Sequence, residues 1–564
     1  MKFSEFVYQR PDVDKIKEEF TQLLNKFKGA NTFEEQDAAL GEIVELRNEI
    51  ESMNYLATIR HTIDTTDEKY KEEDDYFNEV KPIFEGLISD FYQVLVDSKF
   101  RAELEEKWGD QIFRIADLKL KTFAPEVIED LQEENRLRSE YTQLMASAKI
   151  DFEGEERTLA QMYPFQISED REMRKKASKA RYDFMEGIEE KLDEIYDKMV
   201  KVRTRIANKL GFDTFTELGY ARLKRSDYNP EKVANFRRQV KEYIVPVAQK
   251  LKERQKKRLG IDDLKYYDDS FNFKSGNPTP KGDPEWIIKN GKKMYSELSS
   301  ETDEFFTFMV ENELMDLLSK PGKAGGGYCS YISKYEAPFI FANFNGTSAD
   351  IDVLTHEAGH AFQSYMSRDF EIPEYAWPTL EACEIHSMSM EFFTWPWMEN
   401  FFEEDTDKYK FYHLSSALSF IPYGVAVDEF QHFVYENPEA TPEERKHKWR
   451  EIEKKYLPHK DYAGNEYLEN GGFWHKQGHI YTVPFYYIDY TLAQICALQF
   501  WKKMQEDREA AWHDYLHLCK QGGSKSFTEL VEEAGLISPF EDGCVKDVID
   551  DIEQWLDGID DTKL

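Results

Sequence analysis

Two histidines and a glutamate stand close together at His356, Glu357 and His360, in the stretch DVLTHEAGHAFQSYMS. In a helix, residues four apart are separated by ~6 Å along the axis and only ~40° around it, so both imidazoles would point the same way. They could then bind one ion with Zn–N distances of ~2.0 Å. Glu357 lies one step round the helix and could take a proton from a metal-activated water without being a ligand. The spacing therefore indicates metal-assisted hydrolysis.

A catalytic zinc needs a third protein ligand and one open coordination position. The extended motif of the metzincins is excluded, because it requires Gly and His where this chain has Gln363 and Met366. The third ligand must therefore come from another segment.

Three glutamates share one predicted helical face in the segment PTLEACEIHSMSMEFF, residues 378–393. They are Glu381, Glu384 and Glu391. One of these carboxylates could bind the metal, while the others orient the imidazoles through hydrogen bonds. Asp352, one turn before His356, is a further orienting candidate. Helical geometry alone does not decide between Glu381 and Glu384 as the ligand.

The composition narrows the class of protein. The 564 residues include 73 Lys and Arg against 110 Asp and Glu, a net charge of −37, which argues against nucleic acid as a partner. Five cysteines without a CxxC pair indicate thiols in a reducing compartment rather than a disulfide framework. The N-terminal stretch lacks the apolar core of a signal peptide, and no apolar run approaches the ~18 residues of a membrane span. We expect a cytoplasmic protein that does not bind membranes.

Helical spacing dominates the first half of the chain. In residues 12–29, the apolar positions share one helical face, and Asp12 is the expected N-cap. The stretch SGNPTPKGDP, residues 275–284, predicts a loop, either a connection or a lid. Residues 324–347 change to a strand pattern. We expect an edge strand there, whose Ala342 and Asn343 align an extended peptide substrate.

At this point the motifs resemble a known family. HEAGH followed by EIHSMSME is similar to the thimet-oligopeptidase family of zinc metallopeptidases, oligoendopeptidase F and Pz-peptidase branch. The stretches GGGYCS, FIFANFNGT and GHIYTVPFYYIDYTLA extend the resemblance. In that family the third zinc ligand is a Glu that begins an E-x-x-S element, which here implies Glu384, 24 residues after His360. The resemblance thus implies one zinc ion per chain.

The resemblance also implies residues that act on the substrate. In the family, a His and tyrosine side chains close over the substrate and donate hydrogen bonds to the tetrahedral intermediate. His479 matches the histidine, and Tyr486, Tyr487 and Tyr490 are the tyrosine candidates. Tyrosine suits this task because it is a neutral donor at pH 7 on a rigid side chain. The sequence does not decide which of the three contact the transition state.

The expected fold is mainly α with a small β-sheet next to the HExxH helix, and the resemblance implies two helical lobes flanking a deep substrate channel. We divide the chain into an N-terminal helical lobe, residues 1–185, and a catalytic zinc metallopeptidase region, residues 186–564. The function that the resemblance implies is a zinc-dependent endopeptidase acting on internal bonds of short unfolded oligopeptides. Two alternatives stay open, a zinc hydrolase acting on a non-peptide bond and a catalytically inactive helical scaffold.

Overall fold

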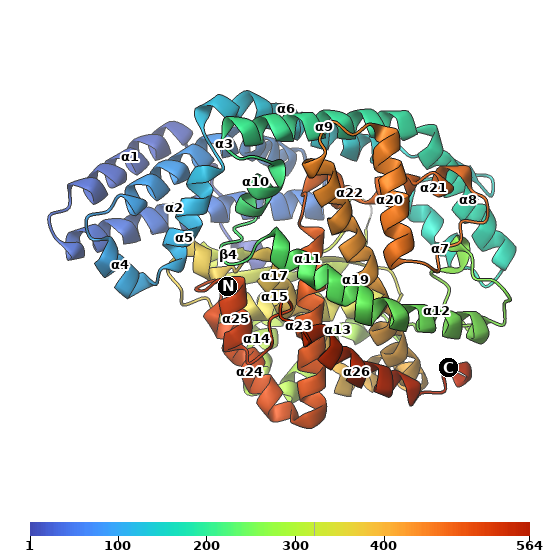
Figure 1. Ribbon diagram of the computed structural model, residues 1–564. Coiled ribbons are helices and arrows are strands. Elements are labelled where there is room, and N and C mark those ends of the chain that lie inside the picture. Colours follow the sequence, from blue (N-terminus) through green and yellow to red (C-terminus); the bar gives the residue numbers. More distant parts are fainter. Residues whose placement is uncertain (321) are drawn as a thin grey trace.

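The structure is a computed structural model that describes residues 1–320 and 322–564. Helices make up most of this part of the chain, and its strands form one two-stranded and one three-stranded sheet (Figure 1). The predicted mainly α fold is confirmed.

Most of the N-terminal helices pack around a second core at one end of the molecule, to which Ile372 and Tyr375 also belong (Figure 1). The helix predicted at residues 12–29 is confirmed, since α1 begins at Val13 and the Asp12 side chain accepts the backbone N–H of Lys15 at 3.2 Å. Phe20, Leu24 and other apolar residues of its predicted face are buried. The helices of this part are α1 Val13–Gly29, α2 Phe33–Ile63, α3 Glu68–Val96, α4 Arg101–Trp108, α5 Gln111–Lys121 and α6 Ile128–Ala146.

The middle of the chain continues with helices and one short hairpin, β1 Ile150–Phe152 and β2 Glu155–Arg157. The loop predicted at 275–284 is present up to Asp283. Pro284 already begins α13, because proline suits the first helical position, where no N–H is needed. These helices are α7 Tyr163–Gln166, α8 Arg171–Gly187, α9 Glu189–Lys209, α10 Phe215–Arg222, α11 Pro230–Gln239, α12 Val245–Leu259, α13 Pro284–Leu298 and α14 Ser300–Glu311.

The three-stranded sheet has the order β3-β5-β4, with β3 Met315–Leu318, β4 Tyr328–Ile332 and β5 Ala337–Phe344. β5 pairs parallel with β3 and antiparallel with β4. The expected edge position of the strand that carries Ala342 and Asn343 is therefore wrong. Lys323 donates a hydrogen bond to the Ala342 carbonyl. The Asn343 side-chain amide donates to the backbone carbonyls of Ala324 and Gly326, in the loop before β4. The short strand β3, which was not predicted from the sequence, covers the edge of β5 opposite β4.

The C-terminal half builds the centre of the molecule, where α15, α17 and α23 lie together (Figure 1). α15 follows β5 directly and packs closely on α17. A Cβ atom added at Gly359 would lie 2.6 Å from the Cα atom of Ser387, so this approach requires glycine. The helices are α15 Ala349–Met366, α16 Pro373–Ala376, α17 Leu380–Phe393, α18 Glu399–Phe402, α19 Thr406–Glu436, α20 Pro442–Tyr456, α21 Glu466–Glu469, α22 Gly478–Thr482, α23 Tyr487–Glu506, α24 Arg508–Gln521, α25 Phe527–Glu533 and α26 Cys544–Asp557.

Two further predictions concern the whole chain. All five cysteines are free thiols, and four of them are buried. Within the described ranges, no helix combines the length and the apolar character that a membrane crossing needs. The division at residue 185 falls near the end of α8 and stays a prediction.

Candidate functional site

Three predicted ligands converge at the contact between α15 and α17. One ligand atom each from His356, His360 and Glu384 lies within 4.8 Å of the others. Oε2 of Glu384 is 3.3 Å from Nε2 of His356 and 3.7 Å from Nε2 of His360. The two imidazole planes are nearly perpendicular, at 83°. Two nitrogens and one oxygen therefore face a common point.

These distances fit one metal ion. Two ligand atoms bound at ~2.0–2.1 Å in a tetrahedral site lie about 3.4 Å apart, close to both nitrogen–oxygen distances found here. Two imidazoles and one carboxylate are also a donor set that zinc binds in hydrolases. The residues present therefore fit the group that the motif implies.

The electrostatics of Glu384 and His360 suit a bound cation, whereas His356 must release a proton to bind one. Burial opposes protonation of His356, but hydrogen bonds with Glu384 and Glu391 outweigh it and raise the pKa of His356 well above its ordinary value. Burial alone would raise the pKa of Glu384, yet His356 and His360 hold it at about 2. Burial lowers the pKa of His360 to about 4, so this imidazole is neutral near pH 7. The site thus keeps a carboxylate and a free imidazole nitrogen side by side.

A chain of hydrogen bonds fixes which nitrogen of His356 faces the cluster. Its Nδ1 lies 2.7 Å from Oε1 of Glu391, and Oε2 of Glu391 lies 2.7 Å from Nε2 of His413 on α19. The indole N–H of Trp395 donates to Nδ1 of His413 at 3.1 Å. Because indole can only donate, His413 must carry its proton on Nε2 and donate it to Glu391. Glu391 then accepts Nδ1–H of His356, which leaves Nε2 as the ligand atom.

Glu357 has the surroundings of a proton acceptor. It is buried, and its Oε2 has no hydrogen-bond partner within residues 1–320 and 322–564. Burial raises the pKa of Glu357 to about 7, with a smaller contribution from the negative charge of Glu384. Its Oε1 borders the sheet, since a Cβ atom added at Gly327, just before β4, would lie 3.5 Å away. An unpartnered carboxyl group therefore stands beside the three ligands.

Among the described residues, two other acidic candidates form no hydrogen bond with the imidazoles. Asp352 accepts the hydroxyl of Tyr409 at 2.6 Å, and burial raises the pKa of Asp352 to about 6. Glu381 accepts the hydroxyl of Tyr228 at 3.2 Å and is not one of the three clustered ligand groups. The structure thus brings Glu384, and not Glu381, to the two histidines.

The predicted substrate-facing residues gather beside Glu384. His479 lies on α22, Tyr486 directly precedes α23, and Tyr487 and Tyr490 lie on α23. The ring centroid of His479 is 5.8, 5.0 and 5.9 Å from those of Tyr486, Tyr487 and Tyr490. The Tyr486 hydroxyl donates to Oε1 of Glu384 at 3.0 Å. All four residues thus form one aromatic group against the ligand cluster.

A strained turn holds this aromatic group in place. Phe485 adopts a positive φ of 66°, which is unfavourable for a residue other than glycine. Its N–H donates to Oε1 of Gln431 at 2.9 Å, and its carbonyl accepts from Arg225 at 2.6 Å. Arg225 is buried and also pairs with Asp489 of α23. Buried polar side chains therefore fix the backbone that presents Tyr486.

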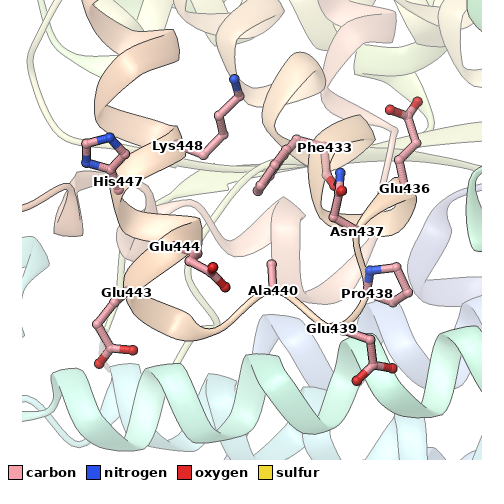
Figure 2. Close-up of a pocket in the computed structure, with 10 residues that line it drawn as sticks. All are labelled: Phe433, Glu436, Asn437, Pro438, Glu439, Ala440, Glu443, Glu444, His447 and Lys448. Atoms are coloured by element: carbon pink, nitrogen blue, oxygen red, sulfur yellow. The ribbon is translucent and has the colours of Figure 1, made fainter.

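A surface hollow lies apart from these residues, at the turn between α19 and α20 (Figure 2). It is lined by exposed acidic side chains, and none of the site residues borders it. Its acidic side chains are Glu436, Glu439, Glu443 and Glu444. We assign this surface hollow no part in the site.

Comparisons with known proteins agree with the motifs. Residues 165–278 and 286–548 match the model of Peptidase family M3, and residues 3–123 match the Peptidase M3 N-terminal domain. The chain belongs to peptidase family M3. This confirms the family resemblance that the sequence predicted.

Relatives of this M3 chain extend the comparison. An oligoendopeptidase F homolog of Lactococcus lactis subsp. lactis (strain IL1403) is 24% identical over 384 residues, which cover 65% of this chain and 61% of the relative, less than two thirds of its length. A solved structure of Pz peptidase A with inhibitor 2 is 66% identical, with a TM-score of 0.95 and 100% of both chains covered. Oligoendopeptidase-F from Enterococcus faecium shares the fold, with 16% identity, a TM-score of 0.63 and coverage of 98% and 99%.

Sequence reasoning missed several residues that contact the predicted ones. His413 follows Glu391 by 22 residues and belongs to no motif with it. Trp395 and Gln431 likewise reach the site only through the packing of α19 against its neighbours. Of these residues, only Gln477 could have been suggested by the sequence, because it lies two residues before His479.

Proposed function

We propose that this M3 chain is a zinc-dependent endopeptidase that hydrolyses internal bonds of short unfolded oligopeptides. The observation that carries the proposal is the convergence of His356, His360 and Glu384 beside the buried Glu357, whose Oε2 has no hydrogen-bond partner among the described residues. Zinc held by these three residues would supply a Lewis acid that polarises the scissile carbonyl and lowers the pKa of water from 15.7 toward ~7. The oligopeptide class is supported by the names of the relatives, oligoendopeptidase F and Pz peptidase.

Glu357 is the general base of the proposed reaction. It accepts a proton from the attacking water on its free Oε2 and delivers that proton to the leaving amine. Burial raises the pKa of Glu357 above its ordinary value in the metal-free chain, which favours the acceptance of a proton. Glu391 and His413 keep the ligand nitrogen of His356 directed at the site.

His479 and the tyrosines supply neutral hydrogen-bond donors for the developing oxyanion. Burial raises the pKa of Tyr486, Tyr487 and Tyr490, so all three keep their protons at neutral pH. Burial lowers the pKa of His479, which keeps this imidazole neutral. Tyr486 donates to Glu384, which assigns it first to orienting that carboxylate. Losing one oxyanion donor typically reduces the rate by ~10²–10³-fold.

The outer edge of β4 pairs with no other strand among the described residues and is the better place for aligning a substrate backbone. β4 is the terminal strand of its sheet, and its start at Tyr328 follows Gly327, which borders Glu357. An extended peptide could pair with this edge and pass the ligand cluster. This proposal replaces strand addition at β5. Contacts of Ala342 and Asn343 with substrate remain a prediction.

A cleavage assay tests the proposed function. The zinc-loaded protein is incubated with a short unstructured peptide and, separately, with folded proteins and casein, and the products are identified by mass spectrometry. We expect internal cleavage of the peptide, loss of cleavage after chelation, recovery with added zinc, and little cleavage of the larger proteins. Hydrolysis of ester or amidated small molecules without peptide cleavage would favour a non-peptide hydrolase. No hydrolysis at all by zinc-loaded protein would favour an inactive scaffold. Equal cleavage of casein would reject the deep substrate channel that the family resemblance implies.

A further inference from the structure

A hydrogen-bonded relay ends on His479, the histidine beside the tyrosines. The amide nitrogen Nε2 of Gln477 lies 2.8 Å from Nδ1 of His479. On the other end of the same amide, the hydroxyl of Tyr423 donates to Oε1 of Gln477 at 2.9 Å. Tyr423 lies on α19, so two separate segments meet at this amide.

The chemistry of these groups decides where the proton of His479 sits. The Gln477 amide has one accepting end and one donating end, and the Tyr423 hydroxyl bonds to the accepting end. In this arrangement the NH₂ group faces Nδ1 of His479 and donates to it. A neutral imidazole has one protonated and one unprotonated nitrogen. Because Nδ1 accepts, the proton must be on Nε2.

The rest of the relay is rigid. The Tyr423 ring packs edge-on against Tyr487 at 5.8 Å and 88°, and against Phe473 at 6.0 Å and 85°. This packing holds the Tyr423 ring beside the Gln477 amide. Tyr487 also contacts the ring of His479, so the relay and the aromatic group share one wall.

The remaining nitrogen of His479 is available to a substrate. Among hydrogen bonds of the described residues, His479 makes one through its side chain, the bond at Nδ1. Its ring lies among Tyr486, Tyr487 and Tyr490. An Nε2–H there is a neutral donor like the tyrosine hydroxyls around it.

We infer that Gln477 is a positioning residue that sets the tautomer of His479, so that Nε2–H donates to the oxyanion of the proposed peptidase reaction, with Tyr423 fixing the amide. The inference rests on the proposed function for the oxyanion alone. The tautomer itself is a property of the folded chain and can be measured without substrate.

Nitrogen-15 NMR of histidine-labelled protein measures that tautomer, in both metal-free and zinc-loaded samples. His479→Asn removes one pair of signals and so assigns them. We expect a pyridine-type signal for Nδ1 and a pyrrole-type signal for Nε2 in the wild type. In Gln477→Glu the new carboxylate would accept a hydrogen bond from Nδ1, so the pattern should reverse or become that of an imidazolium. A wild-type proton on Nδ1, or an unchanged pattern in Gln477→Glu, would overturn the inference.

Kinetics separate positioning from a structural effect. Where Gln477→Glu reverses the tautomer, we expect kcat for peptide cleavage to fall by about 10-fold to 100-fold with little change in KM, at or below the ~10²–10³-fold loss typical of removing one oxyanion donor. In a His479→Asn background the same change should have almost no further effect. Gln505→Glu, at an exposed position on α23, adds the same charge elsewhere and should retain wild-type kcat. An equal loss from Gln477→Glu with and without His479 would contradict the relay. If the wild type cleaves no peptide, the proposed function fails while the NMR result still decides the tautomer.

Discussion

Nδ1 of His356 lies 2.7 Å from Oε1 of Glu391, so a carboxylate holds the nitrogen of this imidazole that faces away from the ligand cluster. The second oxygen of Glu391 is bound by His413 from α19. Three helices, α15, α17 and α19, are therefore joined by one hydrogen-bonded chain directly behind the proposed metal ligand.

This chain predicts that His413 contributes to metal affinity although it does not contact the cluster of ligand atoms. Replacing His413 with Phe removes one donor to Glu391 and loosens the orientation of His356, so zinc affinity should fall by about 10-fold to 100-fold. Competition with a chelator measures the affinity. His517→Phe is the matched control, because His517 is exposed on α24 and pairs with Glu533. Equal zinc affinities of the two variants would show that His413 does not contribute to metal binding.

The ligand role of Glu384 is tested against Glu381, one turn earlier on α17. Glu384→Gln should lose most of the bound zinc, because a neutral amide is a much poorer ligand than a carboxylate. Glu381→Gln should keep one zinc per chain, since Glu381 bonds to Tyr228 instead. Elemental analysis of the purified variants gives the zinc content. Retention by Glu384→Gln together with loss by Glu381→Gln would reverse the assignment.

Glu357 should matter for turnover and not for metal binding. Glu357→Gln keeps the shape of the side chain but cannot accept the proton of the attacking water. We expect kcat for peptide cleavage to fall by about 10²-fold to 10⁴-fold with zinc content unchanged. A variant that cleaves at near the wild-type rate would show that another group is the base.

The close approach of α15 and α17 depends on Gly359. A methyl group there would meet the backbone of Ser387, so Gly359→Ala should lower the free energy of unfolding by about 1–3 kcal/mol and weaken zinc binding as the helices separate. Gly41→Ala, within α2 and with open space around it, should instead raise stability by about 0.5–1 kcal/mol. Denaturant unfolding of the metal-free variants measures both. An unchanged free energy of unfolding in Gly359→Ala would show that α17 can shift away from α15 without loss of stability.

Burial of Glu357 predicts a pH effect on the stability of the metal-free protein. Its pKa rises from 4.5 in the unfolded chain to about 7 in the folded one, so the folded state holds this proton more tightly. Below the unfolded pKa both states are protonated and stability is unaffected. As pH rises from 4.5 to 7, the wild type should lose stability relative to Glu357→Gln, and the difference should level off above that range. A difference that is constant with pH would show that Glu357 is not buried in this way.

The sequence predicted those parts of the site that depend on local periodicity. His356 and His360 share a helical face wherever that helix forms. The E-x-x-S resemblance implied Glu384 as the third ligand without any distance. Asp12 and α1 follow from the same local rules. These features need no knowledge of the packing between distant segments.

Features set by packing between distant segments were not predictable. β3 is only four residues long, and its pairing turned the expected edge strand β5 into the central strand. His413 reaches Glu391 because α19 packs behind α17, and no motif links the two residues. Glu381 shares the helical face of Glu384, yet the burial of Arg225 and Tyr228 nearby gives it other neighbours.

The proposed function requires His356, His360 and Glu384 to hold one metal ion beside Glu357. The most direct test is an anomalous difference map at the zinc absorption edge from crystals of the zinc-loaded protein. We expect one strong peak at ~2.0–2.2 Å from the Nε2 atoms of His356 and His360 and from a carboxylate oxygen of Glu384. A peak elsewhere, or one that Glu384 does not contact, would contradict it.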